Sequence, residues 1–306
     1  AAPTIRCGIE NTATTRIVNG ADVSVARKYS WQVGLAQGKH YYYSCGGSII
    51  TNKHILTVAH CFANPASGTV PCSINLAKQT YVGIGNHNQL ETTDNLPDLV
   101  EPILIKLVFL HENYTCDTGL WDIAVVELTT PIDLLKHADA IHPICLPKDN
   151  CKTYEGLIAT ISGWGSTIGY NLPETKPPEH PTNILQEAQV TVKSITDCKS
   201  NYNNITIGNE TGSMFVDLEQ ELCAGTDQGF ENGGKDTCHG DSGGPISVKE
   251  TGQHVQIGVV SWGLGCASEG YPGVYTRVSY FLDWIKCKVV PETTYTLPIA
   301  VNPIAP

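Results

Sequence analysis

The sequence has few charged residues and none of the spacings typical of a zinc-binding domain. Charged residues make up 16% of its 306 residues, with 30 acidic against 19 basic side chains and a formal net charge of −11. Nucleic-acid binding requires a basic surface, so this charge argues against nucleic acid as a partner. No Cys-x-x-Cys or His-Glu-x-x-His spacing occurs. We therefore expect no metal site.

No hydrophobic run approaches the length of a membrane span, and no signal peptide is evident at the start. We expect no membrane span and a chain that begins after a leader was removed. Twelve cysteines, an even number, indicate an oxidising compartment. Sequons at Asn113, Asn204 and Asn209 are candidate glycosylation sites. Together these features predict a secreted, extracellular protein.

Short apolar and β-branched runs separated by turn residues dominate the chain. Ser48–Ile50, Leu56–Val58 and Ile257–Val260 are examples, and this pattern is typical of an all-β sandwich or barrel. Between 279 and 287 the apolar spacing changes to i, i+3, i+4, which predicts a short helix docked on a barrel. The segments 168–181 and 200–221 have the composition of exposed loops, the second of them inserted, acidic and sequon-bearing.

The segment from Gly234 to Pro245 is the most informative in the chain. It places Ser242 between an aspartate and two glycines, where the backbone can turn sharply and present bare N–H groups. A serine hydroxyl needs a base and a group that orients the base. His60, in Thr-Val-Ala-His-Cys, and Asp122, at the head of an apolar run, supply both. The order His, Asp, Ser is one of the known chain orders of a catalytic triad.

With these motifs the chain resembles the trypsin/chymotrypsin family of serine proteases. The resemblance runs from about Ile17 to Cys287. Further family landmarks, in family order, are Ile17-Val18-Asn19-Gly20, Trp31-Gln32-Val33, Cys45-Gly46-Gly47-Ser48, Ser162-Gly163-Trp164-Gly165, Ser261-Trp262-Gly263 and Pro272-Gly273-Val274-Tyr275.

The resemblance implies a fold and a domain organisation. We expect two packed antiparallel six-stranded β-barrels with a short C-terminal helix, and an active site in the cleft between the barrels. The peptidase domain would span 17–287, with the barrels separated near 131–144. Residues 1–16 would be an activation segment, and 288–306 a flexible tail.

The resemblance also implies the role of each catalytic group. Ser242 would attack the scissile carbonyl, His60 would take its proton, and Asp122 would hold the imidazole and stabilise its cation. The N–H groups of Gly240 and Ser242 would form the oxyanion hole. This chemistry requires no cofactor.

Activation and specificity follow from the same resemblance. Cleavage between Arg16 and Ile17 would create an α-amino group that pairs with Asp241, as in a zymogen. Asp236 would lie at the base of the primary specificity pocket and pair with the Arg or Lys side chain before the cleaved bond. The other substrate-binding residues would be Thr237, Ser261, Trp262, Gly263, Gly265 and Gly273. His239, next to the oxyanion glycine, could add a pH-dependent preference or lie at the rim without a role.

Six disulfides are implied by the family, although spacing alone does not fix their connectivity. The expected pairs are Cys7–Cys145, Cys45–Cys61, Cys72–Cys116, Cys151–Cys287, Cys198–Cys223 and Cys238–Cys266. The first would tether the activation segment after cleavage. The loop Gly85–Asn88 carries Asn86 and His87 where calcium-binding relatives use acids, which argues against calcium there.

The sequence thus predicts a secreted serine endopeptidase that cuts after Arg or Lys, is made as a zymogen and processes selected proteins. Its partners would be those substrates, an activating protease and protein protease inhibitors. One alternative is a catalytically inactive homologue that serves as a binding or cofactor protein. Another is the same fold with a chymotrypsin-like preference, which Asp236 disfavours.

Overall fold

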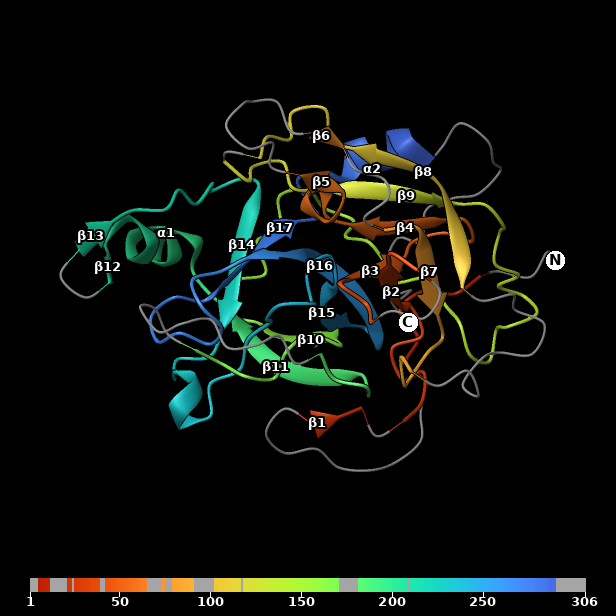
Figure 1. Cartoon of the computed structure of the whole chain (residues 1–306), viewed down its shortest axis with the longest axis horizontal. Helices are drawn as coiled ribbons and strands as arrows, with labels where there is room; N and C mark the ends of the chain where they lie inside the picture. Colours follow the sequence, from red (N-terminus) through yellow and green to blue (C-terminus); the bar gives the residue numbers. More distant parts are fainter. Residues whose placement is uncertain are drawn as a thin grey trace, which may run out of the picture.

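The protein is built of two antiparallel β-barrels packed side by side (Figure 1). Its structure, a computed structural model, describes residues 5–11, 21–23, 25–38, 42–64, 73–74, 79–90, 102–116, 118–170, 181–207 and 210–289. No helix in these ranges is long and apolar enough to cross a membrane.

The first barrel closes in the strand order β2-β3-β4-β9-β8-β7. Its strands are strongly apolar, and β2, β3 and β9 are buried along their whole length. The bounds are β2 Gln32–Ala36, β3 Cys45–Ile49, β4 His54–Thr57, β7 Tyr81–Ile84, β8 Ile103–Leu110 and β9 Ala124–Leu128. A small separate hairpin, β5 Ala63–Asn64 with β6 Ser73–Ile74, follows the 3-10 helix η1, Ala59–Cys61.

The second barrel runs in the order β11-β10-β15-β16-β17-β14 and closes because β14 also pairs with β11. Its bounds are β10 Ile158–Gly163, β11 Gln186–Val192, β14 Glu221–Gly225, β15 Pro245–Glu250, β16 Gln253–Trp262 and β17 Gly273–Arg277. A two-residue strand from the start of the chain, β1 Ala21–Asp22, adds to the outer side of β11. The predicted fold class, two antiparallel six-stranded barrels, is therefore confirmed.

Buried polar side chains join the two barrels. Ser48 Oγ in the first barrel donates to Gln256 Oε1 in the second at 2.6 Å. Ser162 Oγ donates in the opposite direction, to Gln32 Oε1, at 2.8 Å. Because buried polar groups are costly without partners, these bonds favour one relative placement of the barrels. That placement determines the geometry of the cleft.

The N-terminal segment is docked on the second barrel rather than free. Cys7 is joined to Cys145, and the backbone N–H of His254 donates to the Gly8 carbonyl at 2.8 Å. Glu10 accepts hydrogen bonds from His254 Nε2 at 2.9 Å and from Lys249 Nζ at 2.7 Å. Residues 5–11 are thus held by a covalent bond and by several polar contacts.

The C-terminal helix α2 occupies Leu282–Val289, so the segment predicted as a tail from 288 begins with its last turn. Its buried residues belong to the hydrophobic cluster of the first barrel, and Figure 1 shows it beside β8 and β9. Trp284 stacks at 5.1 Å from the ring of His111 and donates to Glu112 at 2.8 Å. The helix is therefore anchored to the first barrel.

This placement overturns one predicted disulfide. Cys287 and Cys151 are both free and exposed. Cys287 lies on the solvent side of α2, whereas the chain beside Cys151 is held near β15 of the second barrel by the Lys152–Glu250 ion pair. The prediction Cys151–Cys287 is wrong because α2 packs on the first barrel and not on the second, near which Cys151 is held.

The segment 200–221 is more regular than the predicted loop. The helix α1, Ile195–Asn203, runs into it, and a hairpin of β12 Ile205–Ile207 and β13 Glu210–Gly212 follows. A short 3-10 helix, η3, occupies Phe230–Asn232. The buried ring of Tyr202 fastens α1 to the barrel, because its hydroxyl donates to the Pro272 carbonyl at 2.8 Å. The other predicted loop is 168–181. Its residues 171–180 lie outside the described residues, and Tyr170 near its start is buried.

Candidate active site

His60 sits on η1, directly after β4, and Asp122 fixes it at two points. Asp122 Oδ1 accepts the backbone N–H of His60 at 2.9 Å, and Oδ2 lies 2.7 Å from Nδ1 of the ring. The Cys45–Cys61 disulfide holds the next residue of η1 to β3. Contact with Asp122 places the proton of a neutral imidazole on Nδ1, which leaves Nε2 as the basic atom.

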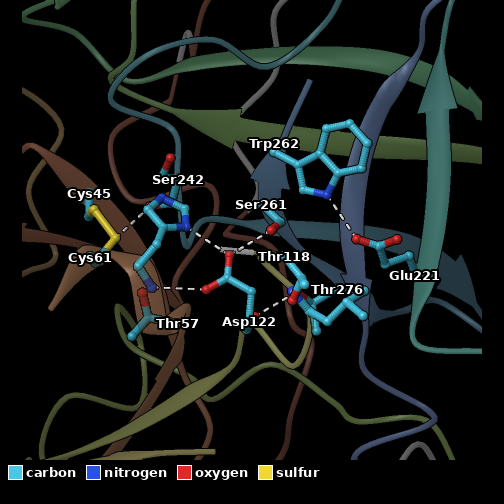
Figure 2. A network of polar contacts seen from close by, with 12 residues as sticks. Cys45, Thr57, Cys61, Thr118, Asp122, Glu221, Ser242, Ser261, Trp262 and Thr276 are labelled. Atoms are coloured by element: carbon cyan, nitrogen blue, oxygen red, sulfur yellow. Dashed lines mark hydrogen bonds and ion pairs between the residues drawn. A yellow bond between two sulfur atoms is a disulfide. The ribbon is translucent and has the colours of Figure 1, made fainter. Parts of the chain in front are cut away.

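Asp122 is buried between the barrels, with only 4% of its surface exposed. Burial by itself raises the pKa of this carboxyl, but the charge of His60 and the hydrogen bonds from His60 and Ser261 outweigh it and hold the pKa below its usual range. The second barrel supplies the Ser261 hydroxyl, which donates to Oδ2 at 2.6 Å, and the Thr276 hydroxyl, which donates to the Asp122 carbonyl at 2.6 Å (Figure 2). Asp122 is thus an ionised acceptor held from both sides.

Ser242 lies beside the loop that carries His60. Its carbonyl accepts the Gly46 N–H at 2.7 Å and lies 3.7 Å from the sulfur of Cys61. Figure 2 shows its side chain above the Cys45–Cys61 disulfide. The next residue, Gly243, has φ +85°, and a Cβ there would come within 2.1 Å of Thr57 Oγ1. Only glycine allows the loop that carries Ser242 to approach the first barrel this closely.

The backbone before Ser242 forms a pair of candidate oxyanion donors. Gly240 adopts φ +98°, a conformation that side chains disfavour. Within the described residues, neither the Gly240 nor the Ser242 N–H donates to a protein acceptor. Two N–H groups without protein partners beside a candidate nucleophile are suited to stabilise a developing negative oxygen.

Asp236 lies in the wall of a pocket of about 280 Å³. Its carboxylate accepts the backbone N–H groups of Thr237 at 2.8 Å and Ala267 at 3.0 Å. Burial raises its pKa to about 7, despite the hydrogen bonds to the carboxylate, and the charge of Asp241 adds to the rise. The absent side chain of Gly273 leaves room for this carboxylate, since a Cβ there would lie 2.5 Å from Oδ1. A carboxyl in such a site favours the binding of a cationic group, because a nearby positive charge would stabilise its ionised form.

Asp241 lines the same pocket and is held by two backbone donors. Gly165 N–H donates to Oδ1 at 2.8 Å and Cys238 N–H to Oδ2 at 3.0 Å. Burial raises the pKa of Asp241 to about 6. This carboxyl has no cation partner within the described part of the chain. Arg16 and Ile17, the predicted cleavage site, lie outside the described residues.

Ser261 and Trp262 form the end of β16 at the site, and Gly263 follows it. The register of β16 with β17 shifts between Val260 and Trp262, so Ser261 is a bulge residue that turns toward Asp122. Bulges commonly re-aim a side chain next to an active site. On its other side β16 pairs with β15 only as far as Val259. The last residues of β16 therefore form a short edge, with Gly263 exposed.

Four of the six predicted disulfides are present: Cys7–Cys145, Cys45–Cys61, Cys198–Cys223 and Cys238–Cys266. Cys116 is disulfide-bonded as well, but its predicted partner Cys72 lies outside the described residues. The Cys238–Cys266 bond joins two segments that both line the pocket of Asp236.

Two clusters combine a histidine with two cysteines: Cys45, His60 and Cys61, and Cys238, His239 and Cys266. In each cluster the cysteines are bonded to each other, so they offer no thiolate to a metal. At the loop considered for calcium, the amide of Asn86 donates to the Tyr43 hydroxyl at 2.8 Å.

The sequence did not reveal two side chains that contact the site. Glu221, at the start of β14, accepts the indole N–H of Trp262 at 2.8 Å. Tyr170 stacks on His239, its hydroxyl 3.0 Å from Nε2. Neither lies in a recognisable motif, and both contacts join segments far apart in the chain. Of the sequons, Asn113 and Asn204 are exposed and Asn209 lies outside the described residues.

Relatives of known class agree with this fold and site. The chain is 36% identical over 288 residues to the proclotting enzyme of Tachypleus tridentatus, covering 91% of this chain and 68% of that protein. It is 34% identical to the venom serine protease Bi-VSP of Bombus ignitus (90% of this chain, 69% of that one). It is 33% identical to the tryptase of Mus musculus (88% and 87%). The fold, the site and these relatives define the class: a serine endopeptidase, which acts on protein or peptide substrates.

The family follows from the same comparison. The family profile described as Trypsin matches residues 17–285, which include all the strands of both barrels and the first half of α2. The chain belongs to the trypsin family of serine proteases.

Proposed function

We propose that the protein is a secreted, zymogen-derived endopeptidase that cleaves after Arg or Lys, with Ser242, His60 and Asp122 as its catalytic triad. The observation that carries the specificity is the Asp236 carboxylate in its pocket. A substrate guanidinium or ammonium group would pair with it in a confined site and hold the preceding carbonyl at Ser242.

In the proposed reaction His60 Nε2 takes the proton of the Ser242 hydroxyl as its oxygen attacks the scissile carbonyl carbon. The carbonyl oxygen becomes an oxyanion and accepts the N–H groups of Gly240 and Ser242. The His60 proton then passes to the leaving amine as the C–N bond breaks, and water, activated by His60, hydrolyses the acyl-enzyme. Asp122 remains ionised and stabilises the imidazolium, which its low pKa supports.

The half-buried carboxyl of Asp241, which has no cation partner among the described residues, supports the zymogen mechanism. An unpaired buried charge is costly, so the new Ile17 amino group would bind there and fix the Asp241–Ser242 segment. The Cys7–Cys145 bond and the Glu10 contacts would keep residues 1–16 attached after cleavage. Secretion is supported by the disulfides, which persist in oxidising compartments. The tethered segment and the β12–β13 hairpin after α1 favour limited proteolysis of selected proteins.

The test of the specificity is substitution of Asp236 by serine in the cleaved enzyme. We expect kcat/KM for an Arg-containing peptide to fall at least a hundredfold, since a buried charge-assisted pair is lost, with little change for a matched Phe peptide. Equal losses for both peptides would contradict the role of Asp236.

The inactive-homologue alternative is tested separately. Covalent labelling of wild-type protein, but not of Ser242→Ala, by a fluorophosphonate would exclude it. Broad cleavage of unrelated denatured proteins at the rate of a preferred site would contradict selective processing.

A further inference from the structure

A buried glutamate holds the tryptophan that flanks the active site. Glu221 Oε1 accepts the indole N–H of Trp262 at 2.8 Å, and the two side chains come from different strands, β14 and β16 (Figure 2). Glu221 is only 5% exposed. The half-buried Trp262 is the last residue of β16, next to Ser261, whose hydroxyl binds Asp122.

The second oxygen of Glu221 is also occupied. Oε2 accepts the backbone N–H of Asp217 at 2.8 Å, so the loop before β14 closes over the carboxylate. On its other side the Trp262 ring packs edge-on against Tyr202 of α1, with centroids 4.9 Å apart. The indole is therefore fixed in position by a hydrogen bond and by an aromatic contact.

The same loop reaches the residue before Asp122. Gln220, adjacent to Glu221, accepts the backbone N–H of Trp121 at 3.2 Å through its side chain. Trp121 has φ +60°, a conformation that is uncommon for a non-glycine residue. Loop 217–221 thus contacts both the Asp122 segment and the β16 edge.

We propose that Glu221 is a positioning residue that orients Trp262 and the β16 edge for the part of the substrate that precedes the cleaved bond. This inference rests on the proposed function. With an Arg or Lys side chain at Asp236 and its carbonyl at Ser242, an extended peptide can add to the β16 edge in the manner of β-augmentation. Its upstream residues would then pass Trp262. A substrate with only the Arg residue would not reach it.

Protonation of Glu221 weakens this arrangement. Burial raises the pKa of Glu221 to about 7, while the Trp262 and Asp217 hydrogen bonds oppose the rise and the charges of Asp217 and Asp122 add to it. Among the described residues, Tyr202 on α1 is a further titratable group that interacts with it. When the carboxyl is protonated, one of its oxygens becomes a hydroxyl. That oxygen then accepts the N–H of Trp262 or of Asp217 less well. The preference for extended peptides over a substrate with only the Arg residue should therefore be lost as the pH falls through about 7.

The experiment uses the full chain cleaved after Arg16 and two substrates with the same leaving group: a blocked single Arg and a tetrapeptide ending in Arg. Protonation of His60 and Asp236 affects both substrates equally, so its effect cancels in the ratio of their kcat/KM values. Glu221→Gln is compared with Glu219→Gln, which removes one charge from an exposed side chain of the same segment. A second variant, Trp262→Phe, removes the indole N–H but keeps a ring.

For Glu221→Gln we expect the tetrapeptide kcat/KM to fall about tenfold, mainly through KM, because one or two buried hydrogen bonds are lost. The single-Arg value should stay within about twofold, which also shows that the variant is folded. The ratio should become independent of pH between 5.5 and 8.5. Adding Trp262→Phe to Glu221→Gln should lower the tetrapeptide kcat/KM only a little further. Glu219→Gln should match the wild type.

An unchanged ratio in Glu221→Gln, an equal fall for both substrates, or a pH dependence of the ratio that persists in this variant would overturn the inference. Failure of the wild-type enzyme to cleave the single-Arg substrate would overturn the proposed function, and the inference with it.

Discussion

Asp122 binds His60 through both carboxylate oxygens, one to the backbone N–H at 2.9 Å and one to the ring at 2.7 Å. The first contact fixes the position of η1 and the second fixes the tautomer and tilt of the imidazole. Because the Ser261 hydroxyl binds the same oxygen as the ring, the carboxylate cannot turn away without losing a second hydrogen bond. His60 is thus positioned by groups from both barrels.

The first prediction concerns this carboxylate. Asp122→Asn keeps the shape but presents an amide N–H to the ring or the Ser261 hydroxyl, which favours the wrong imidazole tautomer. We expect kcat to fall by about 10³–10⁴ with KM nearly unchanged. Steady-state kinetics at pH 8 measures this, with Asp133→Asn, on an exposed turn, as the control. A loss under tenfold would contradict the role of Asp122.

The second prediction concerns the stability cost of Asp236. Its pKa is raised by burial to about 7 from 3.8, so the folded state binds a proton more tightly than the unfolded state. Stability should therefore fall as the pH rises from about 4 to about 7 and stay low above that. Asp236→Asn should raise the Tm at pH 8 by several degrees and leave it unchanged near pH 3.5. Thermal unfolding at both pH values tests this, and an equal effect at both would contradict it.

The third prediction concerns the activation switch. In the cleaved enzyme an α-amino group, whose ordinary pKa is about 8, would gain Asp241 as a partner, and its pKa would rise. The ordered site should then be fully formed below pH 8 and be lost reversibly as the pH rises through the raised value. We expect kcat/KM to fall at alkaline pH. Asp241→Asn should reduce the activity of the cleaved chain to that of the uncleaved chain at every pH. A fully active Asp241→Asn variant would exclude the switch.

The fourth prediction concerns the tether. The Cys7–Cys145 bond spans 138 residues, so after cleavage residues 1–16 should leave the main chain only on reduction. Intact mass before and after reduction measures this. In a Cys7→Ser, Cys145→Ser double variant the segment should still bind, more weakly, through Glu10, and Glu10→Gln should weaken it further. Release of the segment from the cleaved wild-type protein without reductant would refute the tether.

The motifs around Ser242, His60 and Asp122, with the landmarks between Ile17 and Tyr275, carried the resemblance from which the family and the two-barrel fold were predicted. Contacts between distant segments were not predictable in this way. Glu221 begins an ordinary apolar strand, and nothing near it indicates that Trp262 will be its partner. The same holds for α2: its apolar face predicted a helix docked on a barrel but does not specify which barrel covers it. The wrong Cys151–Cys287 pair was taken from the resemblance, and no local feature of the sequence tests it.

The central claim is that cleavage after Arg16 produces an enzyme whose Asp236 selects Arg or Lys. The most direct test is kcat/KM on matched peptides with Arg, Lys, Phe or Ala before the scissile bond, measured before and after that cleavage. We predict negligible activity before cleavage and, after it, a preference for Arg and Lys of at least a hundredfold. A preference for Phe or Ala, or no turnover by the cleaved form, would contradict the claim.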